Sequence, residues 1–344
     1  MNFQDPIQLI GATASPYTQK MLALLRYRRM PYAVTWGDPA TVCEARGLEP
    51  PKPALLPTFL LEDHEVVHAI CDSTPIIRRL EEAQSQRSVL PKDPALAFVD
   101  YLIEDFADEW CTKYMFHYRW HFAADADKAG TILPLAMNPS ICAKELAAFK
   151  KHFSERQIGR LFVVGSNDTT AAVIDASYRR FLKAMEQHLA QQPFMLGRRP
   201  GAGDFALHGQ LSQLVGFDPT PRAITHEISP RSVAWVDRMY DLSGLDPLDG
   251  DWINLEEQSP SLGDLMQEIG RVYVPAQLAN ARAVGAGDKE WGCDIDGAPW
   301  TQRTFPYQAK CLQWTRERYE ALSQSDRARV NTFLDGTGVE AMLS

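Results

Sequence analysis

Residues 7–36 read IQLIGATASPYTQKMLALLRYRRMPYAVTW, and this stretch decides the fold. The apolar run Ile7–Ile10 favours a strand, and a turn of small residues follows it. Apolar side chains then recur at helical spacing over residues 17–29, behind Pro16, which the first turn of a helix tolerates. Tyr32–Trp36 again favours a strand. A strand, a helix and a strand in this order predict a right-handed crossover and therefore a parallel strand pair.

The next segment predicts an antiparallel hairpin and another helix. A proline-rich stretch ends at Pro57, and residues 58–61 and 65–68 then have the composition of two short strands around a turn. Asp72–Pro75 has the residue types that begin a helix. The resulting order, β-α-β followed by β-β-α, is that of a thioredoxin-like domain. We therefore expect residues 1–88 to form an α/β thioredoxin-like domain.

Helical patterns dominate the rest of the chain. Helical spacing is found over residues 95–122, 142–158, 169–191, 204–215 and 231–242. These helices predict an all-α second domain over residues 93–245. Residues 246–344 have further helical patterns at 261–271 and 307–336, separated by a region with Gly, Asp and Trp at 284–305. Their aromatic residues favour a helical extension that packs on the second domain over a disordered tail.

Composition and charge exclude several classes of protein. The 344 residues are 45% hydrophobic and 23% charged, as is usual for globular proteins. The 35 Lys and Arg against 44 Asp and Glu give a net charge of -9, which argues against a nucleic-acid partner. No apolar run is long enough to span a membrane. The N-terminal residues lack the features of a secretory signal, and the six cysteines are scattered, which favours a cytoplasmic protein with reduced thiols.

Three short motifs lie at the starts of the predicted elements. They are Ser15-Pro16-Tyr17-Thr18 before the first helix, Leu56-Pro57 before a strand, and Asp72-Ser73 at a helix start. With the domain order, they resemble the glutathione S-transferase superfamily over residues 7–245. In the helical domain, the segment around Asp204 resembles the capping box of that family, with Gly201 in place of the usual Ser or Thr. The resemblance implies glutathione as co-substrate and a homodimer.

The resemblance places Ser15 beside the glutathione thiol and Tyr17 among the glutathione-binding residues. Hydroxyls occupy both positions, 15 and 18, where glutaredoxin-like proteins carry cysteine, so a dithiol redox cycle is excluded. A hydrogen bond to a thiolate contributes about 1.5 to 3 kcal/mol, and a helix N-terminus about 0.3 to 1 kcal/mol more. Together they would lower the pKa of a bound thiol by roughly 1 to 3 units. The alternative is that Ser15 only caps the helix.

The other two motifs have similar alternatives. The resemblance implies a cis Pro57, with the backbone of Leu56 pairing with the cysteinyl part of glutathione. A trans proline at a strand start is the alternative. Asp72 would take the ligand ammonium and Ser73 its γ-glutamyl carboxylate, although the same residues also form an ordinary helix cap. Lys52 is a candidate partner for the glycine carboxylate.

The first helix of the second domain carries a dense group of aromatic and histidine side chains. In the family this helix lines the co-substrate site, and Tyr114, His117, Tyr118 and His121 lie near one face. Most such stripes are core, but we expect the first three to be exposed members of a pocket. His117 and His121 have the spacing of two metal ligands, yet no glutamate base or further ligand cluster accompanies them, so no metal is expected.

Two functions are compatible with these patterns. The first is a glutathione-dependent transferase, lyase or isomerase, in which Ser15 stabilises a thiolate that attacks a small electrophile, aromatic or otherwise hydrophobic. The second is a glutathione-binding or protein-interaction module that has the fold without catalysis, and fold alone does not choose between them.

Overall fold

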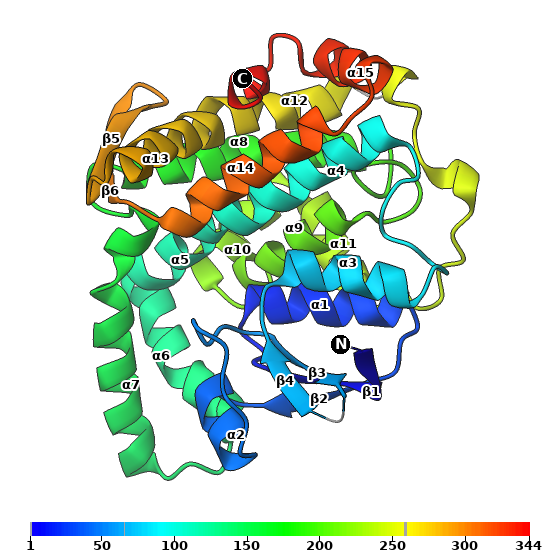
Figure 1. Ribbon diagram of the computed structural model, residues 1–344. Helices are drawn as coiled ribbons and strands as arrows, with labels where there is room; N and C mark the ends of the chain where they lie inside the picture. Colours follow the sequence, from blue (N-terminus) through cyan, green and yellow to red (C-terminus); the bar gives the residue numbers. More distant parts are fainter. Residues whose placement is uncertain (1, 65, 258–259) are drawn as a thin grey trace.

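The computed structural model describes residues 2–64, 66–257 and 260–344, and its N-terminal part is a thioredoxin-like domain (Figure 1). Its elements are β1 (Asn2–Gly11), α1 (Pro16–Tyr27), β2 (Tyr32–Trp36), α2 (Pro39–Ala45), β3 (Thr58–Asp63), β4 (Val66–Ile70) and α3 (Ser73–Ala83). The strands are ordered β2-β1-β3-β4, with β1 parallel to β2 and antiparallel to β3. The predicted strands and crossover are confirmed, except that residue 65 of the predicted strand 65–68 lies outside the described residues.

Alternating side chains of β1 face two different layers. Leu9 belongs to the main core together with Met21 and Leu24 of α1. Ile10 points the other way and packs with Cys43 of α2 and with Leu60. This period of two residues is that of a strand buried on both faces. The sheet therefore holds α1 and α3 on one side and α2 on the other (Figure 1).

The second domain is helical. Its helices are α4 (Pro94–Phe106), α5 (Thr112–His121), α6 (Ala123–Met137), α7 (Ala143–Ile158), α8 (Ala171–Leu189), α9 (Ala202–Leu214), α10 (Pro219–Ile228) and α11 (Pro230–Met239). Helices α4 and α5 are joined through a π-helical turn, Ala107–Cys111. The sequence patterns missed α6 because its buried side chains are few and small. Half of the capping box at the start of α9 is present: the Gly201 backbone N–H donates to Asp204 Oδ2 at 2.9 Å, but Gly201 has no side chain to accept the reciprocal bond.

The C-terminal extension contains helices and a hairpin. Its elements are α12 (Pro260–Glu268), a π-helical turn (Ile269–Tyr273), α13 (Val274–Ala286), β5 (Glu290–Ile295), β6 (Ala298–Arg303), α14 (Pro306–Glu320) and α15 (Gln324–Leu334). The hairpin lies at residues 290–303, within the region 284–305 that separates the two predicted helical patterns. The hairpin turns at Asp296 and Gly297, with φ of 54° and 78°. An Asp-Gly pair at positive φ is the usual two-residue hairpin turn, and this signal was overlooked.

The extension packs on helices of the second domain. Helices α14 and α15 lie against α4, which is also packed on α9, so that α4 is covered on both sides (Figure 1). One continuous cluster of buried apolar side chains includes Leu22 of α1, Phe106 of α4 and Leu312 of α14. Within the described ranges, no helix combines the length and apolar character needed to cross a bilayer.

Candidate functional site

Ser15 is the N-cap residue of α1. Its Oγ accepts a hydrogen bond from the Thr18 backbone N–H at 3.2 Å. This contact uses the oxygen as acceptor and leaves the hydroxyl hydrogen to donate. The preceding residue is held by the second domain, because Arg119 Nη1 donates to the Ala14 carbonyl at 3.1 Å. Arg119 is buried and paired with Asp218 at 2.9 Å, so the turn that carries Ser15 is fixed from both domains.

The proline loop lies beside this turn. The Leu56–Pro57 peptide bond is cis, and β3 starts directly after it. Thr58 is opposite Ile10 in the antiparallel register, so Leu56 lies near the end of β1 that leads to Ser15. Leu56 is half-buried. Lys52 lies further out, with its side chain 83% exposed and its Nζ 2.8 Å from Glu49 Oε1.

Asp72 and Ser73 begin α3. Asp72 has φ 87° and ψ 107°, a backbone conformation that a residue with a side chain rarely adopts and that is concentrated at functional sites. Its half-buried carboxyl group accepts a hydrogen bond from the Tyr307 hydroxyl at 2.8 Å. Burial raises the pKa of Asp72, and the Tyr307 hydrogen bond opposes this rise. Ser73 is buried, and its Oγ accepts from Lys20 Nζ at 3.0 Å.

Lys20 is a buried cation that the sequence analysis missed. Its Nζ also donates to Glu104 Oε1 at 2.9 Å and to Asp108 Oδ2 at 2.6 Å. Burial alone would lower the pKa of Lys20, but the two carboxylates outweigh it and the pKa is raised. The available signal was position: Lys20 precedes the buried Leu24 by four residues and so lies on the core face of α1. A charge on that face requires partners from another element.

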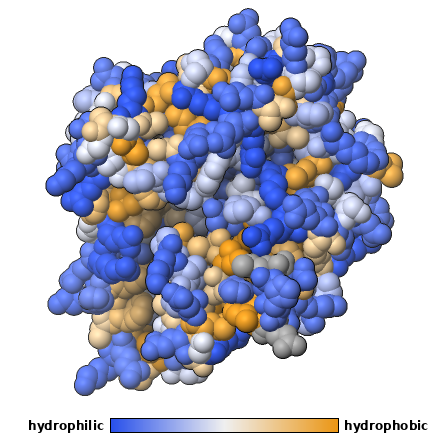
Figure 2. Space-filling model, viewed as in Figure 1, coloured by the Kyte–Doolittle hydropathy of each residue, from blue (hydrophilic) through white to orange (hydrophobic). Residues whose placement is uncertain are grey.

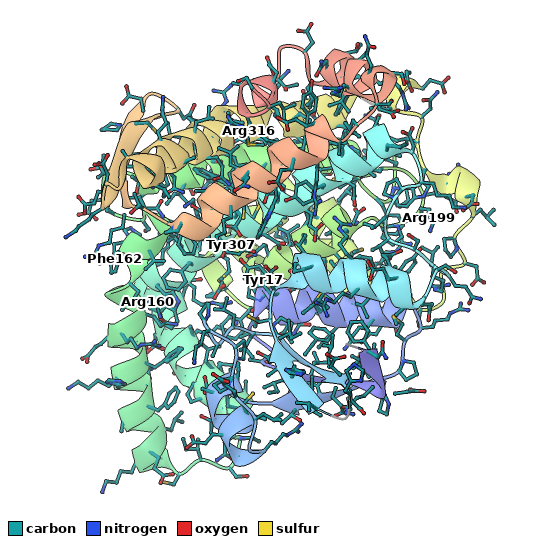
Figure 3. All side chains as sticks on the ribbon, viewed as in Figure 1. Tyr17, Arg160, Phe162, Arg199, Tyr307 and Arg316 are labelled. Atoms are coloured by element: carbon teal, nitrogen blue, oxygen red, sulfur yellow. The ribbon has the colours of Figure 1, made fainter. Side chains whose placement is uncertain are left out.

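Two further side chains, Tyr17 of α1 and Glu109, lie at the π-helical turn. Tyr17, which we expected to contact glutathione, donates its hydroxyl to the Asp108 backbone carbonyl at 2.7 Å. Burial raises the pKa of Tyr17 well above its ordinary value. Glu109 is half-buried, and burial followed by the charge of Asp105 raises its pKa to about 8. Gln308 of α14 donates to Glu109 Oε2 at 3.1 Å. Tyr17 and Tyr307 are labelled in Figure 3, where α14 runs above α3 and α1 in the view.

The predicted pocket wall is largely buried. Tyr114, His117 and Tyr118 are at most 1% exposed, which corrects the expectation that they are exposed. Tyr114 bonds Ser177 at 2.7 Å and Tyr118 donates to Asp175 at 2.6 Å, so α8 covers this face of α5. His121 is half-buried and stacks on His117, with ring centroids 4.6 Å apart.

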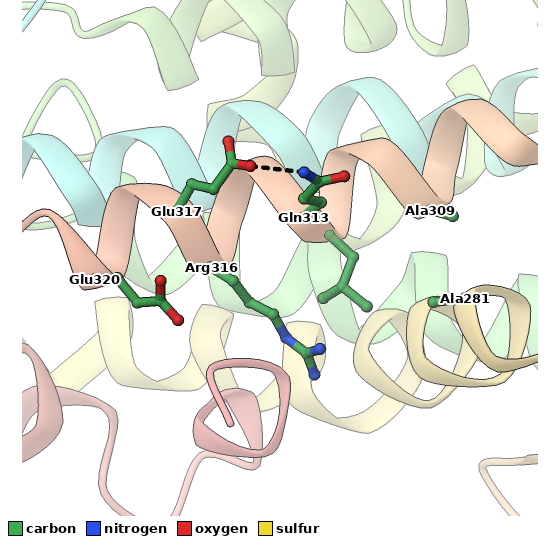
Figure 4. Close-up of a pocket in the computed structure, with 7 residues that line it drawn as sticks. Ala281, Ala309, Gln313, Arg316, Glu317 and Glu320 are labelled. Atoms are coloured by element: carbon green, nitrogen blue, oxygen red, sulfur yellow. Dashed lines mark hydrogen bonds between the residues drawn. The ribbon is translucent and has the colours of Figure 1, made fainter. Parts of the chain in front are cut away.

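Two hollows are visible at the surface. Figure 2 shows one between the thioredoxin-like domain and the α5–α7 side of the helical domain, with apolar side chains in its wall. A shallow groove between α13 and α14 is shown in Figure 4; its lining includes Ala281, Leu312 and Arg316, and it lies apart from Ser15 and Asp72. Across the described ranges, no group of three or more His, Cys, Asp or Glu side chains is arranged to hold a metal ion.

Comparison with known proteins gives one family match and several structural similarities. Residues 9–88 match the family model "Glutathione S-transferase, N-terminal domain". A search of curated proteins found no match. Similar solved structures include FzlA from C. crescentus (17% identity, 72% of this chain and 96% of that chain, TM-score 0.41). A second is a glutathione S-transferase from Rhodospirillum rubrum F11 (14% identity, 72% of this chain and 96% of that chain, TM-score 0.43). A third is the beta-etherase LigF from Sphingobium sp. strain SYK-6 (15% identity, 68% of this chain and 94% of that chain, TM-score 0.43).

The matched residues span β1 at Leu9 through α3 and include Ser15, the cis Pro57 and the Asp72-Ser73 pair. The topology of this part is that of the family's N-terminal domain, and a helical domain follows it. The chain thus contains, over residues 9–88, a match to the N-terminal domain of the glutathione S-transferases.

Proposed function

We propose that this chain binds glutathione and stabilises its thiolate for attack on a small hydrophobic, aromatic electrophile. The observation that carries the proposal is the hydroxyl of Ser15, which caps α1 with its oxygen and keeps its hydrogen to donate. The helix N-terminus adds a favourable field for an anion. The cis Pro57 and the Asp72-Ser73 pair, which belong to the same domain, support a tripeptide ligand placed across the ends of β1 and α3.

The proposed chemistry needs only a positioned thiolate. The Ser15 O–H donates to the sulfur, and the sulfur's electron pair forms a bond to the electrophilic carbon. In a transfer reaction the leaving group departs with the electron pair of the bond that breaks. Orientation of two bound reactants and a stabilised thiolate supply the acceleration. Transfer, elimination and isomerisation share this first requirement, so the same site would serve any of the three.

The remaining ligand contacts follow from position. We assign the backbone of Leu56 to the cysteinyl part and the Asp72 carboxylate to the ammonium. Ser73 keeps its hydroxyl hydrogen for the γ-glutamyl carboxylate, because its oxygen accepts from Lys20. Lys52, exposed and paired only with Glu49 among the described residues, would take the glycine carboxylate. Tyr17 would contribute its ring, because its hydroxyl already donates to Asp108.

We assign the co-substrate to the hollow beside α5 and α6. Of the four side chains that we predicted as its wall, His121 is the half-buried one. We therefore place His121 in the proposed pocket and treat Tyr114, His117 and Tyr118 as the packed layer behind it.

The test combines binding with the acidity of the bound thiol. Glutathione binding is measured by calorimetry, and thiolate absorbance is followed across pH for the wild type and Ser15→Ala. We expect the pKa of the bound thiol to rise by roughly 1 to 2 units in Ser15→Ala, because a charge-assisted hydrogen bond is lost. Ser323→Ala is the matched control: Ser323 caps α15 in the same way, accepting from Asp326 N–H at 3.1 Å, and lies in the extension.

The outcomes separate the two functions. No binding at millimolar glutathione would reject glutathione chemistry altogether. Binding with an ordinary thiol pKa that Ser15→Ala leaves unchanged would reject the catalytic role and favour a non-catalytic glutathione-binding or interaction module. The homodimer remains a prediction from the resemblance, and a solution mass of twice the chain's 38.7 kDa would confirm it.

A further inference from the structure

The first turn of α14 contacts both domains at the candidate site. Tyr307 donates its hydroxyl to Asp72 Oδ2 of the thioredoxin-like domain at 2.8 Å. The next residue, Gln308, donates its side-chain amide to Glu109 Oε2 of the helical domain at 3.1 Å. Both residues belong to the extension, outside the region that resembles the transferases. Figure 3 shows Tyr307 at this end of α14, near Tyr17.

Tyr307 is held in place by its own segment. Asn280 of α13 fixes the backbone just before α14: its Oδ1 accepts from the Phe305 N–H at 2.8 Å and its Nδ2 donates to the Phe305 carbonyl at 2.9 Å. The Tyr307 ring packs edge-on against Trp314, with centroids 5.9 Å apart, and lies 6.2 Å from the ring of Phe305. The ring of Tyr307 is therefore held in place by its neighbours, and its hydroxyl bonds Asp72 with little further loss of side-chain entropy.

Several charged or titratable groups face Asp72. They are Lys20 from α1, Glu104 and Asp108 from α4 and its π-helical turn, and Tyr307 and Cys311 from α14. Burial is the largest influence and raises the pKa of Asp72; the Tyr307 hydrogen bond and the charge of Lys20 lower it, and Glu104 raises it. Burial and the charge of Asp72 raise the pKa of Tyr307, so its phenol stays a neutral donor.

A carboxylate has two oxygens and can accept several hydrogen bonds. We infer that Tyr307 is a positioning residue of the ligand site: its hydroxyl fixes one oxygen of Asp72 and leaves the other for the ammonium of the ligand. This inference rests on the proposed function, in which that ammonium belongs to glutathione. The extension then contributes a residue to the binding site, and in a chain without it the Asp72 carboxyl group would lack the hydrogen bond from Tyr307.

The test compares Tyr307→Phe with Tyr319→Phe. Both changes remove one hydroxyl from α14, but Tyr319 donates to Asn331 at 2.7 Å, away from the site. We expect glutathione to bind about tenfold more weakly to Tyr307→Phe, because a hydrogen bond to a charged group is lost. Tyr319→Phe should bind as the wild type does.

Two further measurements distinguish positioning from a general loss of structure. Asp72 must be ionised to pair with an ammonium, so affinity is lost as the pH falls through its pKa. Without the Tyr307 donor that pKa rises, and the acid limb of the binding profile should move to higher pH in Tyr307→Phe. The wild type should also prefer glutathione to N-acetylglutathione, which lacks the ammonium, and this preference should shrink in Tyr307→Phe but not in Tyr319→Phe.

Each remaining outcome decides the inference. Unchanged affinity and an unmoved acid limb in Tyr307→Phe overturn it while the proposed function stands. Tighter binding also overturns it, because Tyr307 would then compete with the ligand. If the wild type binds no glutathione, the proposed function fails. A double-mutant cycle of Tyr307→Phe with Asp72→Asn, measured by denaturant unfolding, then shows whether Tyr307 and Asp72 are energetically coupled, as positioning requires. Additive losses overturn it, and non-additive losses support it.

Discussion

Lys20 carries a positive charge into the contact between the two domains. It is fully buried, and its three donors are used by Ser73, Glu104 and Asp108. Removing one partner of a buried ion pair is costly, because the charges that remain have neither water nor a counter-charge. The arrangement therefore ties α1, α3 and α4 together at the point where Ser73 would meet the ligand.

We predict that Lys20→Met lowers the free energy of unfolding by about 3 to 5 kcal/mol. The loss arises chiefly from Asp108, which stays buried without its cation, whereas Glu104 keeps its ion pair with Arg78 at 3.2 Å. Urea unfolding at pH 7 measures it. Lys52→Met is the matched control, since Lys52 pairs with Glu49 on the surface and should unfold as the wild type does. Equal stability of the two variants would show that the buried cation is dispensable.

At this scale the sequence predicted the backbone positions of the site better than its side-chain partners. The helix starts at Ser15 and Asp72 and the strand start after Pro57 follow from local turn and cap chemistry, so these backbone settings were predicted, while the roles of the three residues stay predictions. The partners of Lys20 are 53 to 88 residues away and that of Tyr307 is 235 residues away, and no local pattern encodes such distances. The predicted exposure of Tyr114 and Tyr118 is wrong because α8 covers them, and the pattern of α5 alone does not show which helix packs on it.

The β5–β6 hairpin of the extension contacts α5 through Lys113, a buried lysine of that helix. Lys113 of α5 is 2% exposed and lies over the rings of Trp110 and Trp300, at 5.6 and 5.8 Å. Its Nζ donates to Gln302 Oε1 of β6 at 3.1 Å. No ion pair accompanies it among the described residues, and burial lowers its pKa to about 8, against the opposing charge of Glu109. A hairpin that the helical patterns missed thus determines the state of a titratable group.

We predict that this lysine makes the docking of the hairpin depend on pH. The pKa is about 8 in the folded chain against the ordinary 10.5, so the unfolded chain binds more protons between these values. Stability from this group therefore rises as the pH increases from about 8 to 10.5, by about 3 kcal/mol in total. The measurement is the difference in unfolding free energy between the wild type and Lys113→Met at pH 7, 8.5 and 10.

As the pH rises, the free energy of unfolding of the wild type should increase relative to that of Lys113→Met. Lys289→Met, which changes an exposed lysine next to the hairpin, is the control and should show a constant difference from the wild type. A difference for Lys113→Met that is also constant with pH would contradict the prediction.

One large core runs through the whole molecule, beside smaller clusters such as that of Ile10 and Cys43. Apolar side chains of the thioredoxin-like domain, the helical domain and the extension form a single buried cluster, which includes Leu262, Ile269 and Val339 from the extension. The family resemblance predicted the first two parts because they have recurrent elements and spacings. The arrangement of the extension had to come from the structure, since amphipathic helices alone do not specify which neighbour they cover.

We predict that a chain ending at Leu248 does not remain a monodisperse protein. Deleting the extension uncovers the faces of α4 and α8 that α14, α15 and α12 now cover, and large exposed apolar surfaces promote association. Size-exclusion chromatography and binding of a hydrophobic dye, with the full chain as reference, measure this. A truncated chain that elutes as a single sharp peak without dye binding would show that the extension is a separable addition.

The contact between Tyr307 and Asp72 also has a consequence for biosynthesis. Its two residues are 235 positions apart, so the ribosome must make most of the chain before the second one exists. At about 5 to 20 residues per second, the thioredoxin-like domain waits on the order of ten seconds or more for its partner. During synthesis, the contact that we propose to position Asp72 for the ligand is therefore completed late, after the thioredoxin-like domain and most of the helical domain have left the ribosome.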